Sequence, residues 1–146
     1  MIRVVLDTNI IVSALLQPLG PPAQVFSLAV GGSIQLCVSG EVYAEYEEVI
    51  RRPRFRLDQN VIAAALDIIR ERGLWVKPME TVRVCTDPDD DILIECAQAG
   101  RSAYLVTGNL KHFPATWLDI RIVTARRLLE IMAGGGETDE SRHDDR

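Results

Sequence analysis

Acidic side chains at two places in the sequence are spaced so that they could hold a metal ion. Asp7 ends the apolar run 4–6 and is followed by a hydroxyl and an amide, those of Thr8 and Asn9. Residues 87–91 then place four aspartates in five positions, directly before a second apolar stretch. Oxygen ligands without histidine or cysteine favour Mg²⁺ or Mn²⁺ over zinc. An ion held in this way can activate water and stabilise negative charge at a phosphate.

Both acidic groups also have structural explanations that need no metal. An aspartate after a buried run, such as Asp7, can cap a helix or lie in a solvated loop. Carboxylates at a helix N-terminus, such as those of residues 87–91, each stabilise the positive end of the helix dipole by about 0.3–1 kcal/mol. Four acids exceed what capping needs, and they repel one another unless a cation or arginines compensate their charge. Taken alone, each group leaves both interpretations open.

Glu45 is a third candidate acid, and it lies in a helix predicted over residues 39–52. The apolar side chains of this helix recur at helical spacing, at Val42, Tyr46, Val49 and Ile50. At about 100° per residue, Glu45 falls beside this stripe, while the other three glutamates of the helix face more toward solvent. Glu45 is therefore the one placed to point inward, either as a metal ligand or as a border residue paired with an arginine.

A further polar element follows the buried strand predicted over residues 103–106. Thr107, Gly108 and Asn109 come directly after it, and Gly108 suits a tight turn where the backbone approaches another group. His112 could act as an acid, a base or a ligand, although a histidine beside Phe and Pro is more often a packed loop residue. The element offers hydroxyl and amide oxygens to a site at the end of this strand.

Strands and helices alternate along the chain, which predicts the α/β class. Strands are expected at residues 2–7, 34–38, 74–76, 82–85, 103–106 and 120–123. Helices are expected at residues 8–16, 23–30, 39–52, 58–72, from about 91 onward, and 125–133. This pattern favours a three-layer α/β/α fold with a central, mainly parallel sheet. Because parallel crossovers are right-handed, the carboxyl ends of the strands, and the acids after them, should share one edge.

The length of 146 residues suits a single domain. We expect that domain at residues 1–133 and a disordered polar tail at residues 134–146. The sequence has neither an apolar run of about 18 residues, as a membrane span requires, nor the layout of a signal peptide, so a cytoplasmic protein is expected. Its three widely spaced cysteines show no metal-ligand pairing and are expected to be buried, reduced thiols: Cys37, Cys85 and Cys96.

The net charge of −5 argues against a nucleic-acid substrate, but the distribution of the charge weakens that objection. The last ten residues hold five acids and two arginines, which leaves a net charge of −2 on the rest of the chain. Arginine dominates the basic residues and suits bidentate contact with phosphate. Four arginines lie within residues 51–56, around Phe55, as either a solvated connector or a phosphate-contact patch. The composition therefore permits a polyanionic substrate.

Four motifs in this order resemble those of the PIN domain family, and more narrowly those of its bacterial toxin subgroup in toxin–antitoxin systems. They are Leu-Asp-Thr-Asn at residues 6–9, the glutamate that opens residues 45–50, the acidic run at residues 87–91, and Leu-Val-Thr-Gly-Asn at residues 105–109. The resemblance covers nearly the whole expected domain. The ordered set is more specific than any one motif.

The resemblance implies a Mg²⁺- or Mn²⁺-dependent ribonuclease with its acids at the edge of the sheet. It implies that Asp7, Glu45 and an aspartate of residues 87–91 hold the ion. Asp90, near the start of the helix, is the preferred aspartate. Asp91 is the alternative ligand, because a shift of one position in the helix register would exchange the two.

Asn109 departs from the family pattern, since many members have an aspartate at this position. Its amide oxygen can still ligate a metal or orient a bound water, but it brings no charge. The resulting prediction is a metal-dependent endoribonuclease in which Asn9, Thr107 and Asn109 position the attacking water. The resemblance also implies an RNA substrate, no membrane partner, and a small antitoxin encoded nearby whose arginine enters the acidic pocket. Apolar surface on the helices would suit a homodimer.

Two other functions compete with the ribonuclease prediction. A phosphatase-like hydrolase would use Asp7 as its nucleophile, but such folds usually have a second acid two positions on, where this chain has Asn9. A binding module for RNA or protein could keep the fold without catalysis, and Asn109 in place of an acid keeps that alternative open. Metal binding separates the two cases, because a pure binding module has no need of the ion.

Overall fold

A six-stranded sheet forms the centre of the computed structural model, which describes residues 1–134. The strand order is β3-β2-β1-β4-β6-β5, with bounds β1 (Arg3–Leu6), β2 (Gln35–Val38), β3 (Leu74–Trp75), β4 (Tyr104–Val106), β5 (Thr116–Trp117) and β6 (Ile120–Val123). All neighbouring strands pair in parallel except β5, which runs antiparallel to β6. The predicted tail lies outside the described residues, apart from Gly134.

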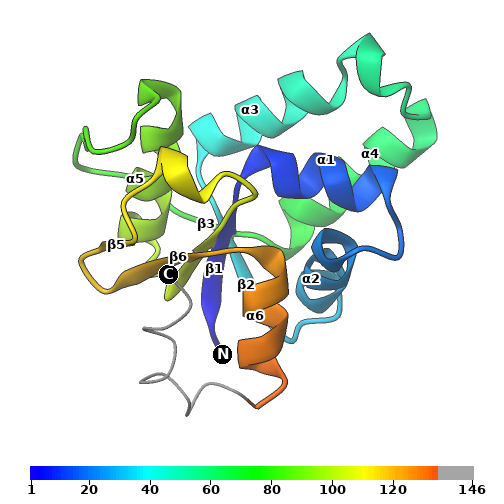
Figure 1. Ribbon diagram of the computed structural model, residues 1–146. Coiled ribbons are helices and arrows are strands. Elements are labelled where there is room, and N and C mark those ends of the chain that lie inside the picture. Colours follow the sequence, from blue (N-terminus) through cyan, green and yellow to red (C-terminus); the bar gives the residue numbers. More distant parts are fainter. Residues whose placement is uncertain (135–146) are drawn as a thin grey trace.

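Helices cover both faces of this sheet, as Figure 1 shows. Their bounds are α1 (Thr8–Leu16), α2 (Pro21–Val30), α3 (Gly40–Ile50), α4 (Gln59–Arg72), α5 (Asp91–Ala99) and α6 (Ala125–Met132), with short 3₁₀ helices η1 (Pro53–Phe55), η2 (Pro88–Asp90) and η3 (Leu110–His112). Helix α5 packs against β1, β2 and β4, while α2 packs against α1 and α6. The predicted three-layer α/β/α fold with a mainly parallel sheet is confirmed. No described helix is long and apolar enough to span a bilayer.

Strand β1 occupies the middle of the sheet, between β2 and β4. Val4, Val5 and Leu6 are completely buried, as expected for a strand covered on both faces. Val4 lies opposite Leu36 on one side and opposite Tyr104 on the other. This central position explains why an uninterrupted apolar run precedes Asp7.

Helix α3 begins at an N-cap formed by Ser39, whose hydroxyl accepts a hydrogen bond from the Val42 amide at 3.1 Å. Tyr46 is fully buried in the face that this helix turns to the core. Its hydroxyl donates to the carbonyl oxygen of Leu6 at 2.5 Å, which joins α3 to the last residue of β1. The bond therefore fixes the helix that carries Glu45 relative to the strand that precedes Asp7.

The strand predicted at residues 82–85 is wrong, because this part of the chain pairs with no other strand among the described residues. Its amides donate instead to carboxylates of α5: Val82 to Glu95 at 2.9 Å, and Cys85 to Asp91 at 2.9 Å. These carboxylates accept the hydrogen bonds that a neighbouring strand would otherwise accept from the backbone amides. The apolar pattern therefore corresponds to an extended segment that is not part of a sheet. The sequence pattern does not predict the two-residue strand β5.

Cys37 and Cys96 are buried as predicted, and all three cysteines are free, but Cys85 is only half-buried.

Candidate active site

The ends of β1 and β4 bring Asp7 and Thr107 together. The Thr107 hydroxyl donates to Asp7 Oδ2 at 2.7 Å, and the Asp7 amide donates to the Val106 carbonyl at 2.9 Å. Both residues are buried, with Asp7 6% and Thr107 0% exposed. Burial raises the pKa of the Asp7 carboxyl, while the Thr107 hydroxyl and the first amides of α1 act in the opposite direction. Asp7 is thus a fixed, largely desolvated carboxyl at the edge of the sheet.

The turn after β4 is docked onto the start of α1. The Gly108 amide donates to Asn9 Oδ1 at 3.2 Å, and the Asn109 amide donates to the Thr107 hydroxyl oxygen at 3.0 Å. Asn109 is exposed, whereas the side-chain oxygen of Asn9 is engaged by the turn. A Cβ at Gly108 would lie 3.6 Å from Asn9 Oδ1, an ordinary contact, so the turn does not require glycine on steric grounds.

Helix α3 contributes Glu45, which is half-buried, whereas the other glutamates of the helix are exposed, as helical spacing predicts. Burial raises the pKa of the Glu45 carboxyl, and the charges of Asp7 and Asp89 raise it further. The hydroxyl of Thr8 lies near Glu45 and lowers the pKa of its carboxyl. This hydroxyl is buried and forms no hydrogen bond with a described residue. Glu45 and Asp7 are therefore close enough for their charges to interact, beside an unpartnered polar atom.

Asp90 ends η2 and reaches the same region from the start of α5. Burial, followed by the charges of Asp7 and Asp87, raises the pKa of Asp90 to about 6. His112 Nδ1 lies 3.7 Å from Asp90 Oδ2, which lowers that pKa in part. Asp87 caps η2 by accepting a hydrogen bond from the Asp89 amide at 2.9 Å. Asp90 is therefore the aspartate of the acidic run whose charge is coupled to Asp7, and His112 is its neighbour.

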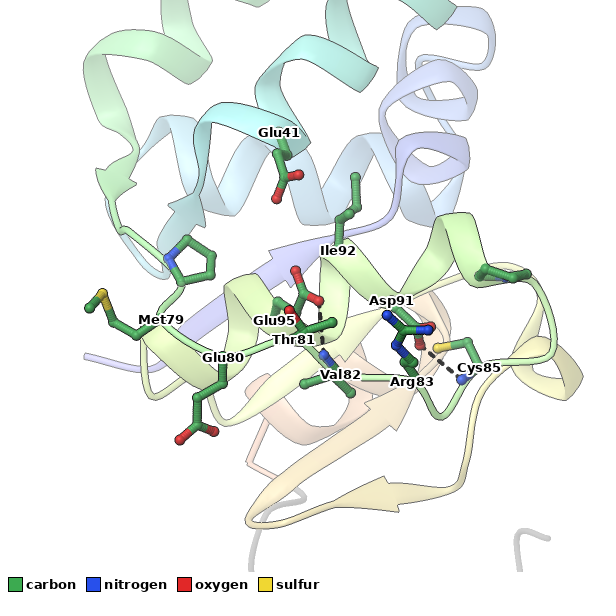
Figure 2. A pocket seen from close by; sticks show the side chains of 12 residues that line it. Glu41, Met79, Glu80, Thr81, Val82, Arg83, Cys85, Asp91, Ile92 and Glu95 are labelled. Carbon is green, nitrogen blue, oxygen red and sulfur yellow. Dashed lines mark hydrogen bonds between the residues drawn. The ribbon is translucent and has the colours of Figure 1, made fainter.

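Asp91 is buried on the other side of this turn. Its Oδ1 accepts hydrogen bonds from the amides of Val84 at 3.1 Å and Cys85 at 2.9 Å. Figure 2 shows the side chain directed toward the segment that contains these two residues. Through these two hydrogen bonds, Asp91 connects the segment before η2 to helix α5.

A separate pocket of about 590 Å³ lies over α5, between the start of α3 and the extended segment that precedes η2 (Figure 2). It is lined by the carboxylates of Glu41, Glu80 and Glu95, together with apolar side chains such as Ile92. Asp7, Glu45 and Asp90 are not among its lining residues. The sequence pattern gave no sign of this pocket, because its wall is the segment predicted to be a strand.

The donors at the edge of the sheet suit a hard cation. The charge of Asp7 raises the pKa values of Glu45 and Asp90, and the charge of Glu45 also raises that of Asp90, so a positive ion would relieve this repulsion. Across residues 1–134, however, no group of three or more His, Cys, Asp or Glu side chains is arranged so that it could hold a metal ion by itself. Mg²⁺ usually retains several waters and takes only one or two carboxylates directly, so an open group of this kind fits it.

An α/β domain with acids at the carboxyl ends of parallel strands defines a class of proteins suited to metal-assisted chemistry on phosphates. Residues 3–111 match the family model described as the PIN domain, and the chain belongs to this family. PIN domains are generally nucleases, and they usually use divalent metals. The membership accounts for the order of the four sequence motifs.

Two further comparisons found similar proteins. The chain is 29% identical over 111 residues to an uncharacterized protein, MJ1680, of Methanocaldococcus jannaschii, covering 74% of this chain and 71% of that protein. The fold of the present chain is similar to that of a chain in the crystal structure of VapBC2 from Rickettsia felis bound to a DNA fragment from their promoter. That match has a TM-score of 0.55 at 18% identity and covers 83% of this chain and 98% of the other.

Replacing Thr107 by valine should weaken both the fold and any divalent-ion site. The substitution keeps the shape but leaves Asp7 Oδ2 and the Asn109 amide without their present partner. We expect a loss of about 1–3 kcal/mol in the free energy of unfolding and a loss of about 10–100-fold in Mn²⁺ affinity. Urea denaturation and calorimetry measure the two effects. Thr107→Ser retains the hydroxyl and should recover most of the affinity; equal losses in both variants would contradict this role.

Proposed function

We propose that this protein is a metal-dependent endoribonuclease that hydrolyses RNA phosphodiester bonds. The observation that carries the proposal is the position of Asp7 at the end of β1, bonded to Thr107 and close enough to Glu45 and Asp90 for its charge to raise their pKa values. Membership of the PIN domain family supports nuclease chemistry in general. RNA as the substrate and Mg²⁺ or Mn²⁺ as the ion are the specific parts of the proposal.

In this proposal Asp7, Glu45 and Asp90 hold the ion, and Asp91 acts through its contacts with the preceding segment. When bound, the ion would lower the pKa of a water and stabilise charge at the phosphate. Thr107 fixes one oxygen of Asp7, since its hydroxyl donates to Oδ2.

Two amide side chains complete the proposed site. Asn9 holds the turn after β4 through its side-chain oxygen, which keeps Thr107 in place. The exposed side chain of Asn109 is available to orient the attacking water or the substrate.

We further propose that the enzyme is the toxin of a type II toxin–antitoxin system. The support is the fold similarity to a chain of the VapBC2 structure, a complex bound to promoter DNA. On this proposal the protein works in the cytoplasm as a homodimer, and a cognate antitoxin is its partner. Residues 1–133 form the nuclease domain.

A second candidate function is a PIN-fold binding module for RNA or protein with weak catalysis or none. Two observations favour it: Asn109 is an uncharged amide after β4, and no group of three or more His, Cys, Asp or Glu among the described residues could hold a metal ion by itself. Such a module would bind its partner without needing Mg²⁺ or Mn²⁺.

Adding Mn²⁺ to the metal-free protein distinguishes the two functions. If the ion binds with a dissociation constant of about 1 mM, 10 mM Mn²⁺ should stabilise the fold by about 1.4 kcal/mol. For a domain of this size that is a rise of about 3–5 °C in Tm. The same ion should start cleavage of a mixed-sequence RNA, and EDTA should stop it. Binding of RNA with neither a shift in Tm nor cleavage would favour the binding module.

A further inference from the structure

The loop that follows α3, residues 51–56, carries four arginines, and we call it the arginine loop. We infer that Arg54 and Arg56 of this loop bind phosphates of the RNA strand whose scissile bond lies at Asp7, Glu45 and Asp90. The inference rests on the proposed ribonuclease function and adds a substrate-binding surface outside the acidic site.

Two of the four arginines are engaged by glutamates of α3. Arg51 Nη2 lies 3.7 Å from Glu47 Oε2. Arg52 forms a bidentate ion pair with Glu48, in which Nε donates to Oε2 at 3.1 Å and Nη2 donates to Oε1 at 2.8 Å. These pairs neutralise the end of the helix and leave the positive charge of the loop on its second half.

Arg54 and Arg56 form no ion pair with any residue in the described part of the chain, and both are exposed. The Arg54 guanidinium lies 4.9 Å from the centre of the Phe55 ring, and Phe55 packs against the core. Stacking of this kind holds a guanidinium without consuming its charge. Its N–H donors remain free for a phosphate, which they can contact in bidentate fashion.

The backbone of the loop is fixed rather than extended into solvent. Pro53 opens η1, and Arg56 closes it in the left-handed region, with φ at 52°. Residues other than glycine rarely adopt this backbone conformation, because it costs them about 1–2 kcal/mol. The turn therefore holds the backbone at both ends of residues 54–56.

Helix α3 joins the arginine loop to the acidic site. At about 1.5 Å per residue, the helix carries the chain about 10 Å from Glu45 to Arg52, and Arg54 and Arg56 follow. Figure 1 shows α3 passing along the edge of the sheet where β1 ends, with the loop at its far end. At about 3.4 Å per stacked nucleotide, this distance corresponds to about three or four nucleotides from the scissile bond.

The opposite end of α3 is unsuitable for a polyanion. Glu41, in the first turn of the helix, lines the pocket over α5, where four acids outnumber the single basic side chain, that of Arg83. Carboxylates there would repel phosphates, whereas arginines at the other end attract them. The charge along α3 therefore directs an RNA strand from the acidic site toward the arginine loop.

The test measures RNA binding separately from cleavage. A labelled single-stranded RNA is titrated with the Asp7→Asn protein, which should not cut it, over a series of KCl concentrations. Adding Arg54→Gln and Arg56→Gln should lower the affinity about tenfold at low salt. It should also reduce the slope of log K against log[KCl] by about 1.4, because each single-strand phosphate contact contributes about 0.7. In the otherwise unchanged chain, the pair should raise KM for RNA cleavage and leave kcat unchanged.

The chain offers a matched control in Arg101 and Arg126. Both are exposed, and Arg101 shares the φ of 52° found at Arg56, so Arg101→Gln with Arg126→Gln removes the same charge from exposed positions elsewhere on the chain. This pair should leave the affinity and the slope nearly unchanged, and Arg54→Lys with Arg56→Lys should retain most of the slope. Equal losses in the two glutamine pairs would overturn the inference. Because binding is measured without cleavage, a wild-type protein that does not cleave RNA would disprove the proposed function. The inferred binding of RNA by the arginine loop would still be judged by the titration.

Discussion

Replacing Asp7 by asparagine is expected to reduce Mn²⁺-dependent cleavage of RNA by about a thousandfold or more. Loss of a group that merely orients a ligand costs about 10–100-fold, and Asp7 is proposed as a ligand itself. Asparagine keeps the size of the side chain, and its Oδ1 can still accept the hydrogen bond that Thr107 now donates to Asp7 Oδ2. The variant should therefore fold while its site loses one negative charge. Single-turnover cleavage with excess enzyme measures the chemical step directly.

Asp119→Asn is the matched control for this experiment, because it removes an exposed aspartate from the turn between β5 and β6. Its cleavage rate should stay within about twofold of that of the wild-type protein. Circular dichroism and urea denaturation of both variants establish that each is folded. A folded Asp7→Asn protein that cleaves RNA at the wild-type rate would exclude Asp7 as a ligand and remove the basis of the proposed site.

The fold could be predicted from the sequence wherever one-dimensional patterns decide the structure. The apolar run before Asp7 has the character of a strand buried on both faces, and it forms the central strand β1. Helical spacing placed Glu45 beside the apolar stripe of α3, where it is half-buried. Parallel order then follows from the alternation of strands and helices, because right-handed crossovers leave few other arrangements.

Features that depend on contacts between distant side chains could not be predicted in this way. Residues 82–85 alternate like a strand, but their amides meet the carboxylates of Glu95 and Asp91 on α5. Nothing in the local pattern distinguishes that outcome from a ladder. The contacts of Asp91 are similar, because nothing in the acidic run indicates that this side chain accepts hydrogen bonds from the amides of Val84 and Cys85.

Asp90→Asn should separate the stability of the fold from its affinity for metal. Burial and the charges of Asp7 and Asp87 raise the pKa of Asp90 to about 6 in the folded protein, from the ordinary value of 3.8. An acid with a raised pKa destabilises the fold wherever it is ionised in both states, so the cost is complete above pH 6 and disappears as the pH falls toward 4. The full shift corresponds to about 3 kcal/mol, and solvent screening of this partly exposed carboxyl reduces that to about 1–2 kcal/mol. Without metal at pH 7.5, the variant should therefore be more stable than the wild-type protein by that amount.

Urea denaturation in EDTA at pH 7.5 and at pH 5 tests the stability gain, which should shrink at the lower pH as Asp90 of the wild-type protein takes up a proton. Asp89→Asn, which removes an exposed neighbour, should change stability by less than about 0.5 kcal/mol. In 10 mM Mn²⁺ the advantage of the variant should shrink by about 1.4 kcal/mol, because only proteins that keep Asp90 gain from binding the ion. A gain that persists at pH 5, or equal stabilisation of both proteins by Mn²⁺, would show that Asp90 is not the acid whose charge the metal compensates.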